Sequence, residues 1–396
     1  MGRRGFAAAV AALVMGLLFV SASSGSPTRS ASLPIGAMFS LTGSGDVFGP
    51  QQVKGARLAV DQINAQGGVD GVPLRLVVRD DRSDPATGKA AMKQLIRTDK
   101  AVAVLGPTLS AVAFSADPIA DSLQTPVIGI SNTAAGIVGK CAYDCRWIWR
   151  DSLGESIAVP ANISAYVFEA HPTTAAILHV AGDVLGDQEA QVARISFRSN
   201  SVRLTADVSV PSGTDNVTAA VRKAIAAKPA VLFIGTVSGA SAAQLMKVAR
   251  AQGFGGTFLG GNTFNSDATA ALAGSAGDGA RSASAWYRGN AFPANSAFVS
   301  AYKQRYGQAP DQFAAQAYIG VQIVADALER GHVATSDKPL ATTRATLQKQ
   351  LPNVALLTPI GPFRFTADHD VSQIVWVLAM TGKGSHRLAG FCNPGC

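Results

Sequence analysis

The chain has 396 residues, of which 47% are hydrophobic and 15% are charged, and it contains 40 glycines. This balance excludes a disordered protein, and the length predicts two or three compact units with sizeable cores. The formal net charge is +8, but the basic residues are scattered and form no block typical of nucleic-acid binding. We therefore expect no nucleic-acid partner.

The N-terminal segment has the three-part layout of a secretory signal peptide. Arg3 and Arg4 precede an uncharged apolar run from Phe6 to Val20, and small residues follow it. A membrane anchor is the alternative, but the run is shorter than the ~20 apolar residues that a spanning helix needs. We predict that residues 1–22 are cleaved and that the mature protein is periplasmic or secreted.

The cysteines form two close pairs, Cys141 with Cys145 in CAYDC and Cys392 with Cys396 in CNPGC. Four cysteines allow three pairings, and we predict a disulfide within each short loop because each loop contains turn-forming residues. Zinc binding is the alternative, but no histidine flanks either pair and the spacing differs from the usual two-residue gap. We expect no metal and no cofactor.

Strands and helices are predicted in alternation along the first part of the chain. Apolar strands are expected at 34–39, 74–78, 101–105 and 127–130. The first helix carries an apolar stripe from Val53 to Ile63, the second begins at Asp84-Pro85 and extends to Thr98, and the third spans 110–122.

A second alternating series begins near Gly154. Its helices are expected at 156–170, 186–197, 216–227 and 241–252, and its strands at 175–180, 202–210, 231–234 and 257–259. The later chain is mostly helical, at 294–306, 311–330 and 342–351, and ends in a strand at 373–380. Such alternation indicates parallel sheets covered by helices on both faces, here in two series.

The stretch from Val102 to Phe114, VAVLGPTLSAVAF, joins a predicted strand to a predicted helix through a turn that contains Thr108 and Ser110. Ligands of open parallel sheets bind beyond the carboxyl ends of the strands, where unpaired helix amides favour an anion. The turn lacks the glycines and the Gly-Lys-Ser/Thr ending of a phosphate loop. A carboxylate fits better, with Ser131 and Thr133 adding hydroxyls after the next strand; the alternative is that these residues only cap helices.

Several segments occur together in the order and spacing of a known family. They are IGAMFSLTGSGDVFGPQQVKGARLAVDQINAQGGVDG, LRLVVRDDRSDP, VLGPTLS, TPVIGISNTA, WIWRDS, AYIGVQIVADAL and TPIGPFRFTADHD. Through them the chain resembles the type I periplasmic substrate-binding proteins of ABC transporters, specifically the Leu/Ile/Val-binding group. The resemblance covers essentially the whole mature chain.

The resemblance implies an α/β fold with two Rossmann-like lobes, joined by a three-crossover hinge, that close on a ligand. We expect an N-terminal lobe of residues 33–153 and 286–360, and a C-terminal lobe of residues 154–285 and 361–391. The resemblance also implies a monomer that delivers a small amino acid, carboxylate or amide to an ABC permease in the membrane.

Ligand contacts of the family fall on hydroxyl residues of the first lobe. Carried over by motif, the carboxylate contacts are Ser110, Ser131 and Thr133, and Phe48 is the aromatic residue that lines the pocket. The resemblance therefore favours ligand contact over simple capping for the three hydroxyls.

The second lobe departs from the amino-acid binders, which place a carboxylate there against the ligand's ammonium group. The corresponding positions are Leu185 and Asn262, and an amide cannot neutralise a buried ammonium. Asp183 is close in sequence and is the expected substitute. On this register we expect the ligand to be a carboxylate or amide without a free α-ammonium group.

Two other functions compete with transport. An exported enzyme is disfavoured, because the chain has no Gly-x-Ser-x-Gly elbow and no His-x-x-x-His pair, so we expect no catalytic residues. A ligand-sensing protein that signals to a receptor would use the same lobe closure, and the sequence does not separate it from a transporter component.

Overall fold

The computed structural model describes residues 32–211, 217–333 and 338–392. The predicted signal peptide, residues 1–22, and Cys396 of the second predicted disulfide lie outside these residues. In the described part, strands alternate with helices as expected, and the strands form two large sheets and one small sheet.

The first sheet has five parallel strands in the order β2-β1-β3-β4-β5. They are β1 (Leu33–Phe39), β2 (Leu74–Asp80), β3 (Ala103–Leu105), β4 (Val127–Gly129) and β5 (Ile148–Arg150). This order places β1 and β3 in the interior, where both faces are buried, and their apolar composition suits that position.

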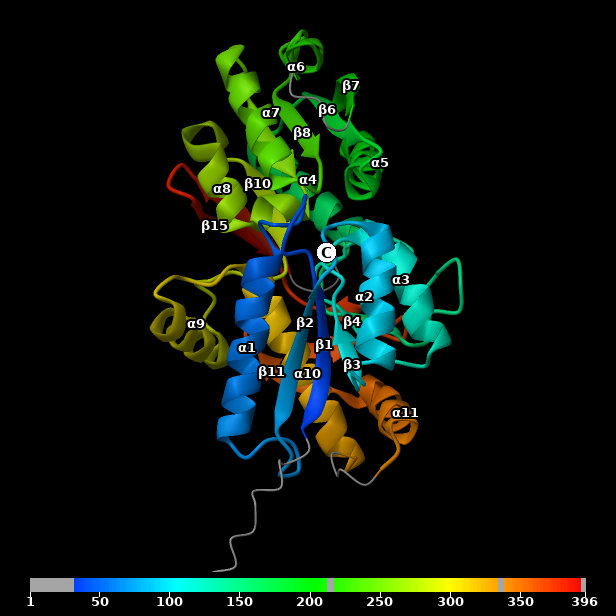
Figure 1. Cartoon of the computed structure of the whole chain (residues 1–396). Coiled ribbons are helices and arrows are strands. Elements are labelled where there is room, and N and C mark those ends of the chain that lie inside the picture. The colour runs from blue at the N-terminus through cyan, green and yellow to red at the C-terminus, as the bar shows by residue number, and fades with distance from the viewer. Residues whose placement is uncertain (1–31, 212–216, 334–337, 393–396) are drawn as a thin grey trace, which may run out of the picture. The chain divides into compact units, whose positions relative to one another are not determined.

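Helices cover both faces of the first sheet (Figure 1). On one face lie α1 (Gly49–Ala65) and α10 (Gln312–Gly331), and on the other lie α2 (Pro85–Arg97) and α3 (Ser110–Ser122). Side chains of β1 alternate between the two cores: Ile35 packs with α1 and α10, and Met38 packs with α2 and α3. The predicted cap at Asp84 is confirmed, because its carboxylate accepts a hydrogen bond from the Thr87 amide.

The second sheet has the order β15-β14-β10-β9-β8-β6-β7. Its strands are β6 (Thr174–Ala181), β7 (Arg203–Pro211), β8 (Val231–Gly235), β9 (Thr257–Gly260), β10 (Arg281–Ser284), β14 (Val375–Thr381) and β15 (Ser385–Cys392). The strands from β7 to β10 are parallel, whereas β14 and β15 are antiparallel additions at one edge.

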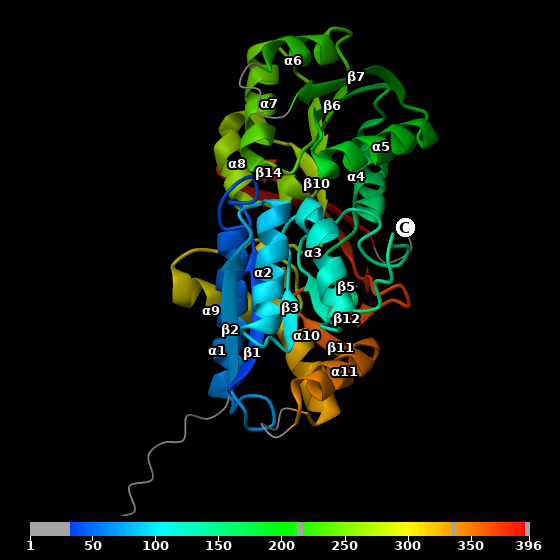
Figure 2. The same ribbon diagram turned by 45° about the vertical axis from the view of Figure 1, so that its right-hand side comes forward.

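Helices also cover the second sheet on both faces (Figure 2). One face carries α4 (Glu155–Ala170) and α5 (Val184–Ser199), and the other carries α6 (Thr218–Ile225), α7 (Gly239–Ala251) and α8 (Asp267–Ala273). The short 3-10 helices are η1 (Asn262–Asn265), η2 (Gly274–Gly277) and η3 (Leu351–Asn353). The predicted two-lobed α/β class is confirmed.

Within the described residues, the chain crosses between the two large sheets three times. The crossovers join β5 to α4, β10 to α9 (Pro293–Tyr306), and β13 (Val371–Ser372) to β14. The third crossover lies later than the expected boundary at residue 361, because β12 (Gly361–Phe365) and β13 pack with the first lobe and place Phe363 and Val371 in its core. The remaining elements are α11 (Leu340–Gln350) and β11 (Ala355–Thr358), which pairs with β12.

Three of the four tryptophans lie next to these crossovers. Trp149 is in β5, just before the first crossover, and its indole donates to the Gln348 side chain. Trp286 is in the second crossover, and Trp376 follows the third, with its ring 5.7 Å from that of Tyr287 in the second. The aromatic contact therefore links the second crossover to the start of β14.

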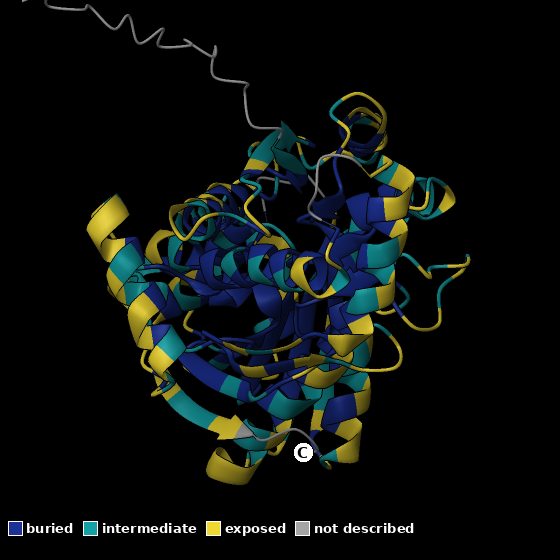
Figure 3. Cartoon of the chain, turned by 90° about the horizontal axis from the view of Figure 1, so that it is seen from below, coloured by how far each residue is buried: buried dark blue, intermediate teal, exposed yellow. Residues whose placement is uncertain are grey.

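The burial pattern follows from the layers (Figure 3). The central strands are buried, and exposed residues lie on the outer sides of the helices. Among the described residues, none of the helices combines the length and the apolar character that crossing a bilayer requires.

The loop between β4 and β5 contains the first predicted disulfide, which is confirmed. Cys141 and Cys145 are bonded, with their Cα atoms 6.2 Å apart. We expect both thiols to resist alkylation in the native protein and to be labelled after reduction, which intact-mass spectrometry measures. Labelling of either cysteine before reduction would contradict this pairing.

Candidate functional site

Predicted site residues from both lobes meet at the carboxyl ends of the parallel strands. Ser110 follows β3, Ser131 and Thr133 follow β4, and Asn262 follows β9 in the second lobe. All four are buried. The arrangement matches the expectation that ligands of open α/β sheets bind beyond the carboxyl ends of the strands.

The hydroxyls do not act as helix caps, so that alternative interpretation is wrong. The cap position of α3 is Leu109, which makes no side-chain cap bond, and that of α4 is Gly154. Ser110 Oγ instead accepts a hydrogen bond from the Ala134 amide at 3.2 Å. This bond ties the loop after β4 to the start of α3.

A buried network fixes the loops after β3 and β4. Gln52 of α1 donates to Ser131 Oγ at 2.8 Å and accepts from Thr108 Oγ1 at 2.6 Å. Ser131 Oγ donates to the Thr108 carbonyl at 2.8 Å, and the Ser40 amide donates to Thr108 Oγ1 at 2.9 Å. Because each of these groups has a partner, the network positions the loops rigidly.

Thr133 joins the first lobe to the second through a carboxylate that the sequence analysis did not select. Thr133 Oγ1 donates to Glu155 Oε1 at 3.1 Å, and the Asn262 amide donates to the same oxygen at 2.9 Å. Glu155 is the first residue of α4, directly after the first crossover. One carboxylate therefore contacts a loop from each large sheet.

The side chain of Asn262 also bridges the lobes. Its amide nitrogen donates to the Ser131 carbonyl at 3.2 Å, and its Oδ1 accepts from Gln312 Nε2 at 2.7 Å. The other amide atom of Gln312, Oε1, accepts from Ser284 Oγ at 2.5 Å and from the Ala285 amide at 2.8 Å. Gln312, at the start of α10, thus connects Asn262 to the second crossover.

The other three predicted site residues are placed differently. Phe48 is buried, with its ring centroid 4.5 Å from that of Phe313, and belongs to the core beside α2 and α3. Leu185 is buried in the first turn of α5. Asp183 caps α5: its Oδ1 accepts from the Leu185 and Gly186 amides at 3.1 Å, and its Oδ2 accepts from the Val237 amide at 2.5 Å. The geometry does not favour Asp183 as an ammonium partner, because the helix cap already occupies its carboxylate.

A second buried carboxylate, Glu189 of α5, lies beside Glu155. Burial raises the pKa of Glu155 to about 7, against the hydrogen bonds from Asn262 and Thr133. Burial, followed by the negative charges of Glu155 and Asp183, raises the pKa of Glu189 well above its usual range. Such a pair favours holding a proton at neutral pH.

The sequence did contain a signal for Glu189. Leu185, Ala193 and Phe197 form an apolar stripe at four-residue spacing on α5, and Glu189 interrupts it. A charged residue on a buried stripe indicates either a buried pair or a binding group. Glu155 gave no comparable signal, because its burial depends on the crossover that places α4 against the other lobe.

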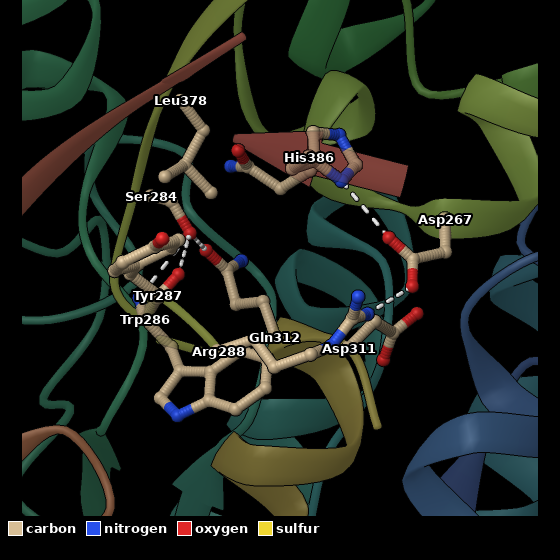
Figure 4. A pocket seen from close by; sticks show the side chains of 10 residues that line it. Asp267, Ser284, Trp286, Tyr287, Arg288, Asp311, Gln312, Leu378 and His386 are labelled. Atoms are coloured by element: carbon tan, nitrogen blue, oxygen red, sulfur yellow. Dashed lines mark hydrogen bonds and ion pairs between the residues drawn. The ribbon is translucent and has the colours of Figure 1, made fainter. Parts of the chain in front are cut away.

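A small cavity of about 20 Å³ lies at the crossovers, next to Gln312 (Figure 4). Arg288 is paired with Asp267, whose other oxygen is 2.9 Å from His386 Nδ1. Asp311 lies on the same wall, and burial raises its pKa to about 7. The cavity has room for a single water molecule. We therefore assign Arg288, Asp267, His386 and Asp311, which line it, to the hinge.

Two α/β lobes, three crossovers and a polar site between the carboxyl ends of both sheets define a two-lobed binding protein. A family model described as periplasmic binding protein matches residues 32–385. The chain belongs to the periplasmic binding protein family.

Curated relatives from Pseudomonas aeruginosa have similar sequences. One, named amino acid binding protein, is 28% identical over 277 residues, which are 69% of this chain and 69% of the relative. Another, named leucine-, isoleucine-, valine-, threonine-, and alanine-binding protein, is 24% identical and aligns over 88% of this chain and 89% of its own length.

Solved structures share the fold. The branched-chain amino acid transporter substrate binding protein LivJ from Streptococcus pneumoniae, in complex with isoleucine, has a TM-score of 0.78 at 24% identity and covers 91% of this chain and 99% of its own. A solute binding protein of an ABC transporter from R. palustris, in complex with benzoate, has a TM-score of 0.81 at 22% identity, with coverage of 92% and 97%.

Proposed function

We propose that this protein is an exported solute-binding protein that captures a small carboxylate or amino-acid-like ligand between its lobes and delivers it to an ABC permease. The observation that carries the proposal is the meeting of Ser131, Thr133 and Asn262, from the carboxyl ends of both sheets, at one lobe boundary. A ligand that bridges these loops would favour the state in which the lobes are in contact.

The relatives support the transport role, because their names describe amino acid binding and ABC transporter components. Export follows from the predicted signal peptide at residues 1–22, with a periplasmic or secreted location, and the disulfide between Cys141 and Cys145 suits an oxidising compartment. The protein is proposed to act as a monomer, since a two-lobed chain forms a complete site by itself.

The direct test is a thermal-shift screen of the purified mature protein against amino acids, aliphatic and aromatic acids, and amides. Bound solute stabilises the folded state by mass action, so a solute present well above its dissociation constant raises the melting temperature. An absence of any shift across the whole collection would contradict the proposal.

The double variant Ser110→Ala with Thr133→Val is expected to weaken solute binding at least tenfold. Each lost hydrogen bond to a charged group contributes roughly 1.5–3 kcal/mol, and about 1.4 kcal/mol corresponds to a factor of ten. Calorimetry with a solute from the screen measures the change, and circular dichroism checks the fold.

The matched control is Ser122→Ala with Thr342→Val, which removes the same groups from exposed positions. Its affinity is expected to equal that of the unmodified protein. If both double variants bound the solute with equal affinity, the assignment of Ser110 and Thr133 to the binding site would be wrong.

A further inference from the structure

Apolar side chains from the two lobes contact each other across the lobe boundary. Val47 belongs to the loop between β1 and α1 of the first lobe, and Val237 belongs to the loop between β8 and α7 of the second. Both are partly buried and pack against the same buried cluster of the first lobe, which includes Phe48 and Leu109. Together with Gly239, they form what we term the closure contact.

Gly239, the first residue of α7, allows Val47 to approach the second lobe closely. A Cβ atom at position 239 would lie 3.1 and 3.2 Å from the two methyl carbons of Val47, and 2.5 Å from Thr269 Oγ1. Ser266, which caps α8, also donates from its hydroxyl to the Val47 carbonyl at 3.4 Å. The second lobe therefore contacts both the side chain and the backbone of Val47.

Asp183 holds the loop that carries Val237. Its Oδ2 accepts hydrogen bonds from the Val237 amide at 2.5 Å and from Thr236 Oγ1 at 3.1 Å. Thr236 Oγ1 in turn accepts from the Ser238 amide at 3.2 Å. Because Oδ1 is used separately to cap α5, the two oxygens of this carboxylate join the start of α5 to the loop after β8.

The loop that carries Val47 is also held within its own lobe. The Gly45 amide donates to Ser83 Oγ at 3.0 Å, and this hydroxyl donates to the Thr42 carbonyl at 2.7 Å. The Phe48 amide donates to the Gly45 carbonyl at 2.9 Å. Each half of the closure contact is thus formed inside one lobe, so the contact depends on how the lobes are placed.

We propose that the closure contact stabilises the closed state by the same amount for every solute, and that Asp183 is a positioning residue for this contact. The inference rests on the proposed function, because closure on a solute is the step that the contact assists. Closure removes the Val47 side chain from water, which is favourable whatever the solute's chemistry. The apparent affinity for a solute scales with the population of the binding-competent state, so the contact sets affinity by acting on the lobes.

Asp183→Asn separates the two uses of the carboxylate. The amide oxygen can still accept from the first amides of α5, but the amide nitrogen cannot accept from Val237 or Thr236. We expect affinity to weaken about tenfold, by the same factor for each probe that binds among L-leucine, isocaproate, L-phenylalanine and hydrocinnamate. Calorimetry measures the affinities, and circular dichroism checks the fold. A loss for the amino acids alone, with the acids unchanged, would make Asp183 an ammonium partner and overturn the inference.

Val47→Ala tests the first lobe's half of the contact. We expect affinity to weaken about three- to tenfold, again by one common factor, because the closed state loses buried apolar surface. The matched control is Val248→Ala, which removes a partly buried valine of α7 that packs against the core of its own lobe. This control should bind as the unmodified protein does. Equal affinities of Val47→Ala and the control would contradict the proposal.

A cross-link tests the closure contact without any solute. In a disulfide, the sulfur of one cysteine lies about 3 Å from the Cβ atom of the other, which the spacing of Val47 and Gly239 matches. Val47→Cys with Gly239→Cys, combined with Thr269→Ala to make room, is expected to form one additional disulfide under oxidising conditions. Alkylation followed by intact-mass spectrometry measures it, and the cross-linked protein should exchange a bound probe at least tenfold more slowly than the reduced one.

The control for the cross-link replaces Gly239→Cys with Gly255→Cys, where a Cβ atom meets nothing within 4 Å. Its two new thiols should remain open to alkylation. Equal alkylation of the two cysteine variants would overturn the inference, whether or not a solute has been found. The proposed function, in contrast, fails only if the solute screen gives no shift in melting temperature.

Discussion

Replacing Gly55 with valine is expected to lower the free energy of unfolding by roughly 3 kcal/mol, because α1 and α10 cross in direct backbone contact at this residue. A Cβ atom at position 55 would lie 2.0 Å from the Ala314 carbonyl oxygen. The helices must then move apart across the largest core of the first lobe. Urea unfolding, followed by two spectroscopic probes, measures the loss.

The matched control is Gly255→Val, since a Cβ atom there meets nothing within 4 Å. Its stability is expected to change by less than about 0.5 kcal/mol, as for most surface substitutions. If Gly55→Val were as stable as this control, the close crossing of α1 and α10 would be wrong. The substitution should also weaken solute binding, because α10 begins with Gln312, the partner of Asn262.

Glu189→Gln is expected to remove much of the pH dependence of stability in the ligand-free protein. A buried carboxyl group with a raised pKa makes its full contribution to stability when the pH is below the pKa that the group has in the unfolded protein. This contribution is lost as the pH rises through the pKa that the group has in the folded protein. For Glu155 these values are 4.5 and about 7, so the loss is roughly 3 kcal/mol across this window. The melting temperature of the unmodified protein should decrease as the pH rises from about 5 to about 8. The melting temperature of the variant should decrease less over the same range.

Other buried acids, such as Asp117 and Asp151, also have raised pKa values and contribute to the fall in both proteins. The difference between the two curves therefore isolates the Glu155–Glu189 pair. The control Glu169→Gln should give a curve parallel to that of the unmodified protein, because Arg281 lowers the pKa of Glu169 and moves its titration below this window. If the curve of melting temperature against pH for Glu189→Gln were parallel to that of the unmodified protein, Glu155 and Glu189 would not share a proton.

Local signals were sufficient to predict most of the fold. Helix α3 spans the predicted residues 110–122, and the Asp84-Pro85 start of α2 is correct, since capping and periodicity act over a few residues. Strand β10 was missed because its sequence, RSAS, has no strand-forming pattern. Its place is set by neighbours distant in sequence, β9 and β14, which pair with it on either side.

The site was only partly predictable, for a similar reason. Ser131 and Thr133 follow a strand end, and that position can be recognised in the sequence. The Glu155–Glu189 pair joins two helices of the second lobe, α4 and α5, and the Gln312–Asn262 bond joins the two lobes, so both depend on contacts between elements distant in sequence. Asp183 is the opposite case. Its position in the sequence suits a ligand-binding carboxylate, but in the structure this carboxylate accepts hydrogen bonds from the first amides of α5 and caps that helix.

The tryptophans beside the crossovers give this protein a built-in optical signal. Trp286 lies on the second crossover and Trp376 in β14, directly after the third, and the Trp376 ring lies 5.7 Å from that of Tyr287 on the second crossover. Solute capture should therefore alter the intensity or wavelength of intrinsic fluorescence without any attached dye. Stopped-flow emission would then report the rate of capture, and replacing Trp376 with phenylalanine would show how much of the signal comes from the start of β14.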